Sequence, residues 1–166
     1  MAKKKSILDL YKMKENGEKA AWIVLYDACF ASYAEEAGMD MILCGDSVGM
    51  IVYGFPGTVP VTMDVSIAHC QAVRRGAPNT YLIGDLPFGS YHASCEDAVR
   101  NAVRFYKEAD VDAVKLEGGV AVADKIRAIV NAGMVVFGHI GLTPQSSASM
   151  GGFKAQGRTT DSAKAV

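Results

Sequence analysis

The sequence predicts an α/β protein with a parallel sheet, either an open doubly wound sheet or a (β/α)8 barrel. Short apolar runs alternate with longer segments of helical periodicity, and the runs are continuously apolar rather than alternating. Continuous runs of this kind are typical of strands that are covered on both faces. The predicted strands are AWIVLY (21–26), MDMILCG (39–45), NTYLIG (79–84), VDAVKL (111–116) and MVVFG (134–138).

The segments between these runs predict helices, because apolar residues recur in them at helical spacing. Three of the four segments have a glycine as their last or next-to-last residue, which suits the C-terminal cap of a helix. The order of elements is therefore a repeated βα unit. The predicted helices cover DACFASYAEEAG (27–38), VSIAHCQAVRRGA (65–77), CEDAVRNAVRFYKEA (95–109) and VAVADKIRAIVNAG (120–133).

The length of the chain bounds how much of a barrel it holds. A complete (β/α)8 barrel takes about 250 residues, and this chain has 166. We therefore expect residues 1–166 to be a single domain, the N-terminal portion of one TIM barrel with roughly the first five βα units. The ending DSAKAV (161–166) looks like the capped first turn of another helix, so we expect a missing C-terminal part.

Composition disfavours several kinds of partner. A formal net charge of -1 offers no general attraction to nucleic acid or an anionic membrane, and we expect the basic run at residues 3–5 to be a solvated terminus. No apolar run approaches the about 20 residues that a membrane helix needs. The 4 cysteines form no CxxC pair, which disfavours a zinc site or a disulfide framework. We predict a cytoplasmic protein that binds neither nucleic acid nor membrane.

A polar side chain follows four of the predicted strands directly: Asp46, Asp85, Glu117 and His139. Parallel strands point the same way, so residues at their C-terminal ends share one rim, where such folds place their active sites. Taken singly, each residue has a structural alternative, as a helix cap, a loop acid or a hydrogen-bonded histidine at the edge of the core. Their recurrence predicts a functional rim.

The three carboxylates of this rim predict a cation. Asp46, Asp85 and Glu117 would repel one another and raise one another's pKa unless a cation compensates them. Oxygen ligands favour Mg²⁺ or a similar hard cation over zinc. Lys115 lies two residues before Glu117, so both side chains project to the same face of a strand. The lysine either pairs with Glu117 or binds an anionic substrate, and we favour the substrate.

Seven stretches of the chain carry a resemblance to a known family: GDSVGM (45–50), VPVT (59–62), AVRRGAP (72–78), GDLPFGSY (84–91), VKLEGG (114–119), GHIGLTPQ (138–145) and GGFKAQGR (151–158). Together they closely resemble the ketopantoate hydroxymethyltransferase family, the 3-methyl-2-oxobutanoate hydroxymethyltransferases of pantothenate and coenzyme A biosynthesis. Several of the stretches are long, and they occur in the order of the family. The resemblance covers about residues 23–158.

The resemblance implies a (β/α)8 barrel of the phosphoenolpyruvate/pyruvate superfamily and a Mg²⁺-dependent reaction. A hydroxymethyl unit would pass from 5,10-methylenetetrahydrofolate to 3-methyl-2-oxobutanoate, giving 2-dehydropantoate. It implies Mg²⁺ ligands at Asp46, Asp85 and Glu117, and keto-acid contacts at Asp46, Ser47, Asp85 and Lys115. His139 is a candidate auxiliary group. The partners implied are the keto acid, the folate and further copies of the chain, with a decamer as the familiar form.

The chain departs from the family pattern in two places. Leu25 replaces the small polar residue that usually precedes the tyrosine at this strand end, here Tyr26. The general base proposed for the family is a glutamate in the later half of the barrel, beyond Val166. The catalytic base is therefore unknown for this chain, and we expect a true half-barrel to keep a metal rim without normal catalysis.

Two other functions remain open. A carbon–carbon lyase of the same superfamily would use a similar Mg²⁺ rim, although GHIGLTPQ and GGFKAQGR argue against it. A non-catalytic fragment that binds metal or only oligomerises is the other. Tightening of Mg²⁺ binding by a keto acid would favour an enzyme site, and Mg²⁺ binding indifferent to the acid would favour the fragment.

Overall fold

The structure, a computed structural model, describes residues 4–166. Its five strands form one parallel sheet in the order β1-β2-β3-β4-β5. Each strand pairs with the next along the chain, as in a (β/α)8 barrel. The five predicted strands are confirmed, with ends shifted by a few residues. They are β1 (Trp22–Val24), β2 (Met41–Cys44), β3 (Tyr81–Asp85), β4 (Ala113–Glu117) and β5 (Val136–His139).

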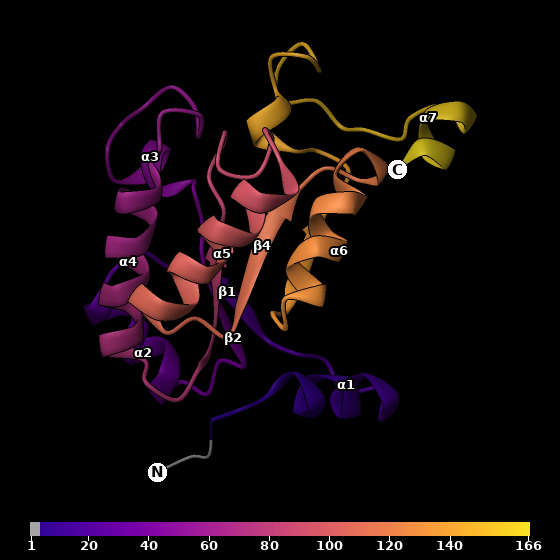
Figure 1. Cartoon of the computed structure of the whole chain (residues 1–166). Helices are drawn as coiled ribbons and strands as arrows, with labels where there is room; N and C mark the ends of the chain where they lie inside the picture. Colours follow the sequence, from indigo (N-terminus) through magenta and orange to yellow (C-terminus); the bar gives the residue numbers. More distant parts are fainter. Residues whose placement is uncertain (1–3) are drawn as a thin grey trace.

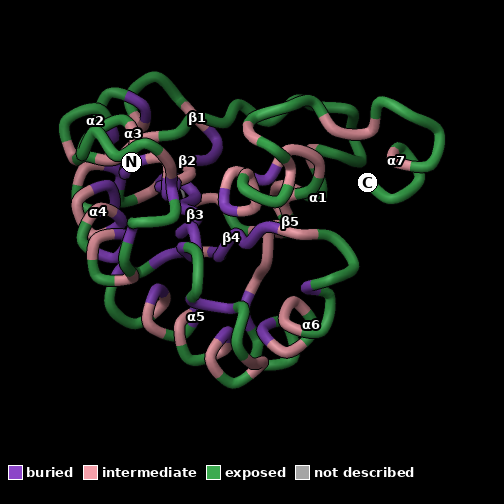
Figure 2. Tube along the Cα trace, turned by 90° about the horizontal axis from the view of Figure 1, so that it is seen from above, coloured by how far each residue is buried: buried purple, intermediate pink, exposed green. Residues whose placement is uncertain are grey.

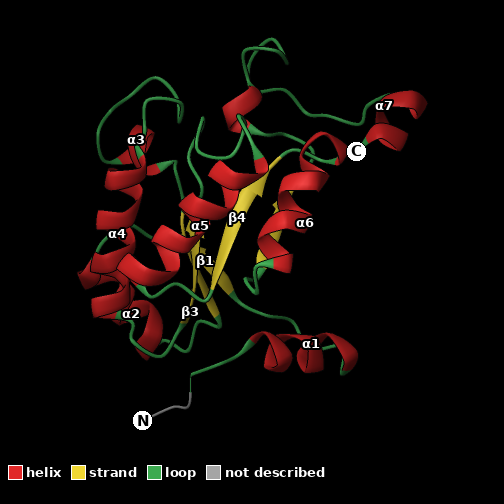
Figure 3. Ribbon diagram, in the orientation of Figure 1, coloured by secondary structure: helices red, strands yellow, loops and turns green. Residues whose placement is uncertain are grey.

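Helices cover the outer side of the sheet (Figures 2 and 3). The four predicted helices are confirmed as α2 (Ala28–Glu36), α4 (Met63–Gly76), α5 (Cys95–Ala109) and α6 (Ala123–Asn131). Within the described residues, no helix combines the length and the apolar character that crossing a membrane requires. The shorter elements are α3 (Val48–Ile51), the 3-10 turns η1 (Val120–Val122) and η2 (Pro144–Ser146), and α7 (Thr160–Ala165).

The sheet is curled like part of a barrel, and its strands follow an arc in the view from above (Figure 2). The rings of Trp22 and Phe137 meet edge to face with centroids 5.7 Å apart, although β1 and β5 lie at opposite edges of the sheet. This curvature distinguishes the barrel from the open doubly wound sheet. Strand β1 is exposed along its length, contrary to the prediction of two covered faces, because it pairs with β2 alone among the described strands.

Helix α1 (Ile7–Glu15) is absent from the elements predicted by sequence. Ser6 and Asp9 form a capping box at its start, a signal that the sequence does contain. Ile7 and Leu10 pack against the small apolar cluster of Met41, Tyr81, Ile83 and Ala113. Figure 1 shows α1 at one end of the molecule, opposite the loops at the C-terminal end of β4.

The basic N-terminus is not the solvated terminus that we expect from sequence. Lys4 Nζ lies 2.7 Å from the carboxylate of Asp112, and Lys5 pairs with Asp40. Lys3 lies outside the described residues. These ion pairs fasten the segment before α1 to the N-terminal end of the sheet.

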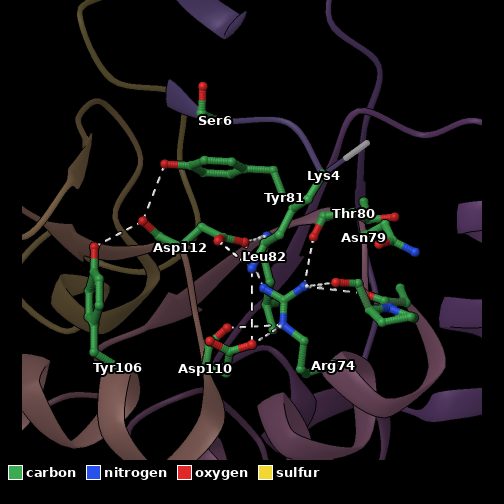
Figure 4. Close-up of polar contacts among 12 residues, drawn as sticks. Lys4, Ser6, Arg74, Asn79, Thr80, Tyr81, Leu82, Tyr106, Asp110 and Asp112 are labelled. Carbon is green, nitrogen blue, oxygen red and sulfur yellow. Dashed lines mark hydrogen bonds and ion pairs between the residues drawn. The ribbon is translucent and has the colours of Figure 1, made fainter. Parts of the chain in front are cut away.

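A buried arginine, Arg74 of α4, organises this N-terminal end (Figure 4). Its Nη1 donates to the carbonyl oxygen of Thr80 at 2.9 Å, and its Nη2 donates to the carboxylate of Asp112 at 2.6 Å. Asp112 also accepts from the backbone N–H of Leu82, and its carbonyl oxygen accepts from the hydroxyl of Tyr106. The network therefore joins α4, α5 and β3 at the end of the sheet opposite the predicted rim.

Two of the predicted glycine caps are confirmed and one is wrong. Gly38 and Gly133 follow α2 and α6 with φ of 81° and 89°. Gly76 is instead the last residue of α4. A Cβ at Gly76 would lie 2.1 Å from the carbonyl oxygen of Ala28, so its missing side chain allows α4 to approach α2 closely.

We expect Gly76→Ala to lower the free energy of unfolding by about 1–3 kcal/mol, because the added methyl group must displace the backbone of α2. Chemical denaturation of the purified protein measures this. Gly57→Ala is the matched control, since a Cβ at Gly57 meets nothing within 4 Å. Equal stability of the two variants would show that the helices separate at no cost.

Candidate active site

A cavity of about 480 Å³ opens at the C-terminal ends of the strands. The register places Asp85 beside Lys115 and Glu117 beside His139, so β3, β4 and β5 present these groups to one rim. The structure brings together all the residues that the sequence nominated, while their chemical roles remain predictions. The cavity is lined by Asp46, Ser47, Asp85, Lys115, Glu117 and His139.

Part of the cavity wall is apolar. Leu43, Phe137, Ile140 and Pro144 line it, together with Trp22 from β1. A polar floor beside an apolar wall is typical of sites for small molecules that carry both a charged group and a hydrocarbon group.

Lys115 forms a buried double ion pair. Its Nζ lies 3.0 Å from Asp85 Oδ2 and 2.9 Å from Glu117 Oε1. Burial lowers the pKa of Lys115, but the carboxylates of Asp85 and Glu117 outweigh that effect and hold the pKa above its ordinary value. The ion pair with Glu117, which is the structural alternative to substrate binding, is thus present in this structure.

Asp85 is the carboxylate with an uncommitted oxygen. Its Oδ2 accepts from Lys115 and from the backbone N–H of Asp46 at 2.9 Å, while Oδ1 is buried and has no hydrogen-bond partner. Burial raises the pKa of Asp85 to about 7; Asp46 adds to the rise and Lys115 opposes it. A buried acceptor without a partner in the protein is rare, and Oδ1 is therefore the rim oxygen that is free to accept from a ligand or to coordinate a cation.

Glu117 is the carboxylate most engaged with the protein itself. Besides Lys115, its Oε1 contacts His139 Nδ1 at 3.2 Å. Its Oε2 accepts from the backbone N–H of Gln145 at 3.0 Å. Both carboxylate oxygens of Glu117 are therefore hydrogen-bonded, to groups from β4, β5 and the segment after β5.

Ser47 lies at the start of α3, next to Asp46. Its Oγ is 2.8 Å from the hydroxyl of Tyr26, which follows β1. Leu25, the departure from the family pattern, is partly buried against the hydrophobic core and does not line the cavity. The apolar replacement at position 25 therefore packs against that core.

Three further residues contact the rim, and the strand-end rule nominates none of them. Gln145, Tyr91 and Tyr26 touch Asp46, Glu117 and Ser47 through hydrogen bonds. Gln145 and Tyr91 end the motifs GHIGLTPQ and GDLPFGSY. Neither follows a strand directly, so the rule that nominated the other residues passes over them.

The donor chemistry of the rim fits a hard cation. Three buried carboxylates face one ammonium group, which leaves two uncompensated negative charges when all four groups are ionised. Asp85 Oδ1 adds an unpartnered oxygen. Within residues 4–166, however, no three His, Cys, Asp or Glu side chains stand as a ready-made metal site. Lys115 Nζ already lies between Asp85 and Glu117, so a cation would compete with it.

The curled parallel sheet, with its polar rim at the carboxyl ends of the strands, defines the protein as an α/β protein with part of a barrel. A solved 2,3-dimethylmalate lyase of the PEP mutase/isocitrate lyase superfamily matches 79% of this chain and 51% of its own at a TM-score of 0.61 and 22% sequence identity. A phosphonopyruvate hydrolase solved in complex with oxalate and Mg²⁺ matches 81% of this chain and 52% of its own, with a TM-score of 0.64 and 16% identity. At these identities the likeness shows the fold alone.

Sequence comparison identifies the family of the chain. The family model described as ketopantoate hydroxymethyltransferase matches residues 4–166, and the chain belongs to this family. It is 68% identical over 166 residues to the 3-methyl-2-oxobutanoate hydroxymethyltransferase of Alkaliphilus metalliredigens and 52% identical over 164 residues to that of Heliobacterium modesticaldum. These alignments cover 100% and 99% of this chain but 59% of each relative. The chain thus spans under two thirds of the length of these relatives.

Proposed function

We propose that the protein transfers a hydroxymethyl unit from 5,10-methylenetetrahydrofolate to 3-methyl-2-oxobutanoate, giving 2-dehydropantoate for pantothenate synthesis. The observation that carries this proposal is the buried rim of Asp46, Asp85, Glu117 and Lys115 in a chain of this family. A small 2-oxo acid suits the cavity when a divalent cation offsets the excess negative charge of the rim, because Lys115 can then face the carboxylate of the acid and the wall beside it is apolar.

The proposed cofactor is Mg²⁺, which Asp46, Asp85 and Glu117 would hold. When bound, it would supply positive charge that stabilises the negative charge developing on the keto-acid oxygens as the neighbouring carbon loses its proton. The unpartnered Oδ1 of Asp85 supports this assignment. Oxygen donors alone are the set that Mg²⁺ prefers.

The remaining side chains would orient the acid. Lys115 would neutralise its carboxylate, and Ser47 would donate a hydrogen bond to it, with the Ser47 hydroxyl held by Tyr26. His139 contacts Glu117 and would act only as an auxiliary group. We assign the general base to none of the described residues. A homo-oligomer in the cytoplasm stays a prediction from the family resemblance.

Product formation tests the proposal directly. The intact mass of the purified protein is recorded first, and the protein is then supplied with Mg²⁺, 3-methyl-2-oxobutanoate and methylenetetrahydrofolate. If the mass is well above the 17.6 kDa of this sequence, we expect 2-dehydropantoate by mass spectrometry, and loss of product when a chelator removes Mg²⁺. At a mass of 17.6 kDa we expect Mg²⁺ binding without normal catalysis. Exchange of the C3 hydrogen of the keto acid in deuterated water reports proton removal without the folate.

Ligand binding and substrate cleavage distinguish the proposed transferase from the non-catalytic fragment and from the carbon–carbon lyase. Oxalate is an unreactive stand-in for a 2-oxo acid, and we expect it to tighten Mg²⁺ binding in isothermal titration calorimetry. Mg²⁺ binding that ignores oxalate would favour the non-catalytic fragment. Cleavage of 2,3-dimethylmalate or oxaloacetate would favour a carbon–carbon lyase.

We expect Lys115→Met to weaken the binding of oxalate but not the binding of Mg²⁺. Oxalate affinity at saturating Mg²⁺ should fall at least about tenfold, because a hydrogen bond to a charged group contributes about 1.5–3 kcal/mol. Mg²⁺ affinity without oxalate should hold or rise, because the competing ammonium group is gone. Calorimetry measures both.

Lys107→Met is the matched control for this prediction, since Lys107 is exposed on α5. A Lys115→Met protein with a lower melting temperature but unchanged oxalate affinity would mean that the lysine serves only the ion pairs.

A further inference from the structure

Gln145 is buried at the mouth of the barrel, in the 3-10 turn η2 after β5. Its side chain makes three hydrogen bonds. Nε2 donates to Asp46 Oδ2 at 2.8 Å and to the carbonyl oxygen of Leu86 at 3.0 Å, and Oε1 accepts from the hydroxyl of Tyr91 at 2.6 Å. Its backbone N–H also donates to Glu117 Oε2. One residue therefore contacts two of the three rim carboxylates, which lie 99 and 28 positions away in sequence.

The neighbours of Gln145 fix the orientation of its amide. Tyr91 is fully buried, and its hydroxyl donates to the amide oxygen. A reversed amide would set that oxygen against the carboxylate of Asp46 and the carbonyl of Leu86, which are both acceptors. The N–H groups of Gln145 are therefore committed to Asp46 and Leu86.

Tyr91 also ties this arrangement to β4. Its hydroxyl accepts from the backbone N–H of Glu117 at 3.2 Å and lies the same distance from the carbonyl oxygen of Glu117. The chain of contacts runs from Glu117 through Tyr91 and Gln145 to Asp46. It spans the rim from the end of β4 to the end of β2.

We propose that Gln145 is a positioning residue that sets the rotation of the Asp46 carboxylate, and that Tyr91 holds Gln145 in its working orientation. This inference rests on the proposed function, in which Asp46 holds Mg²⁺ for a 2-oxo acid. Buried partners that orient a ligand in this way typically change metal affinity about 10- to 100-fold. The role requires the hydrogen-bonding groups of Gln145, whereas a packing role requires only its volume.

Two variants test the inference in the purified full chain. Gln145→Leu keeps about the same volume and removes every side-chain hydrogen bond, and we expect Mg²⁺ affinity in the presence of oxalate to fall about tenfold. Tyr91→Phe removes one hydroxyl oxygen and should weaken binding about threefold. Gln71→Leu, on the outer surface of α4, is the matched control and should bind as the wild type does.

Melting temperatures and a crystal structure of Gln145→Leu separate positioning from packing. Positioning predicts a rotated Asp46 carboxylate and weakened Mg²⁺ binding at temperatures well below the melting point. Wild-type affinity in Gln145→Leu would overturn the inference; if that variant does not fold, wild-type affinity in Tyr91→Phe would do so. Failure of the wild-type protein to bind Mg²⁺ with oxalate would instead overturn the proposed function, and this inference with it.

Discussion

Asp85→Asn is expected to abolish Mg²⁺-dependent turnover in a complete enzyme and to weaken Mg²⁺ binding in this chain, while leaving the fold intact. Asn keeps the size of the side chain and an oxygen for the backbone N–H of Asp46, but it removes the negative charge and one of the two oxygens. Mg²⁺ affinity should fall about 100-fold or more, since even the loss of a group that only supports a metal ligand costs about 10- to 100-fold. Calorimetry with Mg²⁺ and oxalate measures the affinity.

The same change should cost little stability. Burial raises the pKa of Asp85 to about 7, and Lys115 keeps Glu117 as an ion-pair partner in the variant, so no buried cation is left unpaired. Asp64→Asn, an exposed carboxylate paired with Arg104 on the outer surface, is the control and should leave Mg²⁺ binding unchanged. Wild-type Mg²⁺ affinity in Asp85→Asn would remove Asp85 from the metal site.

Arg74→Met is expected to lower the free energy of unfolding more than any other change proposed here, by about 3–5 kcal/mol. This is the cost typical of removing one partner of a buried ion pair. The guanidinium group satisfies Asp112 and the carbonyl oxygen of Thr80 in a buried setting (Figure 4). Methionine fills much of the volume but donates no hydrogen bond. Urea denaturation at neutral pH measures the change.

Arg75→Met is a closely matched control, because Arg75 is the next residue of α4 and is exposed. Surface substitutions of this kind usually change stability by no more than about 0.5 kcal/mol. Equal urea midpoints for Arg74→Met and Arg75→Met would show that Lys4, the other cation beside Asp112, is enough to compensate the charge of Asp112. Mg²⁺ affinity is the second measurement. It should be unchanged in the folded Arg74→Met protein, since the network lies at the end of the sheet opposite the rim.

The candidate rim was predictable because it follows a positional rule. Asp46, Asp85, Glu117 and His139 stand at strand ends, and parallel strands bring such positions together. Lys115 follows from the two-residue period of a strand. Gln145 obeys neither rule, since its place depends on how the segment after β5 folds back over the mouth of the barrel.

By itself, the sequence determined the βα order, the parallel sheet, the rim residues and, through its motifs, the family. These depend on local periodicity and on short patterns. Only the tertiary structure decided that α1 packs at the N-terminal end of the sheet, that Lys115 is shared by Asp85 and Glu117, and that Gln145 reaches Asp46. Such contacts join residues that are distant along the chain, and their geometry follows from the curl of the sheet and the packing of the loops, which no local pattern specifies.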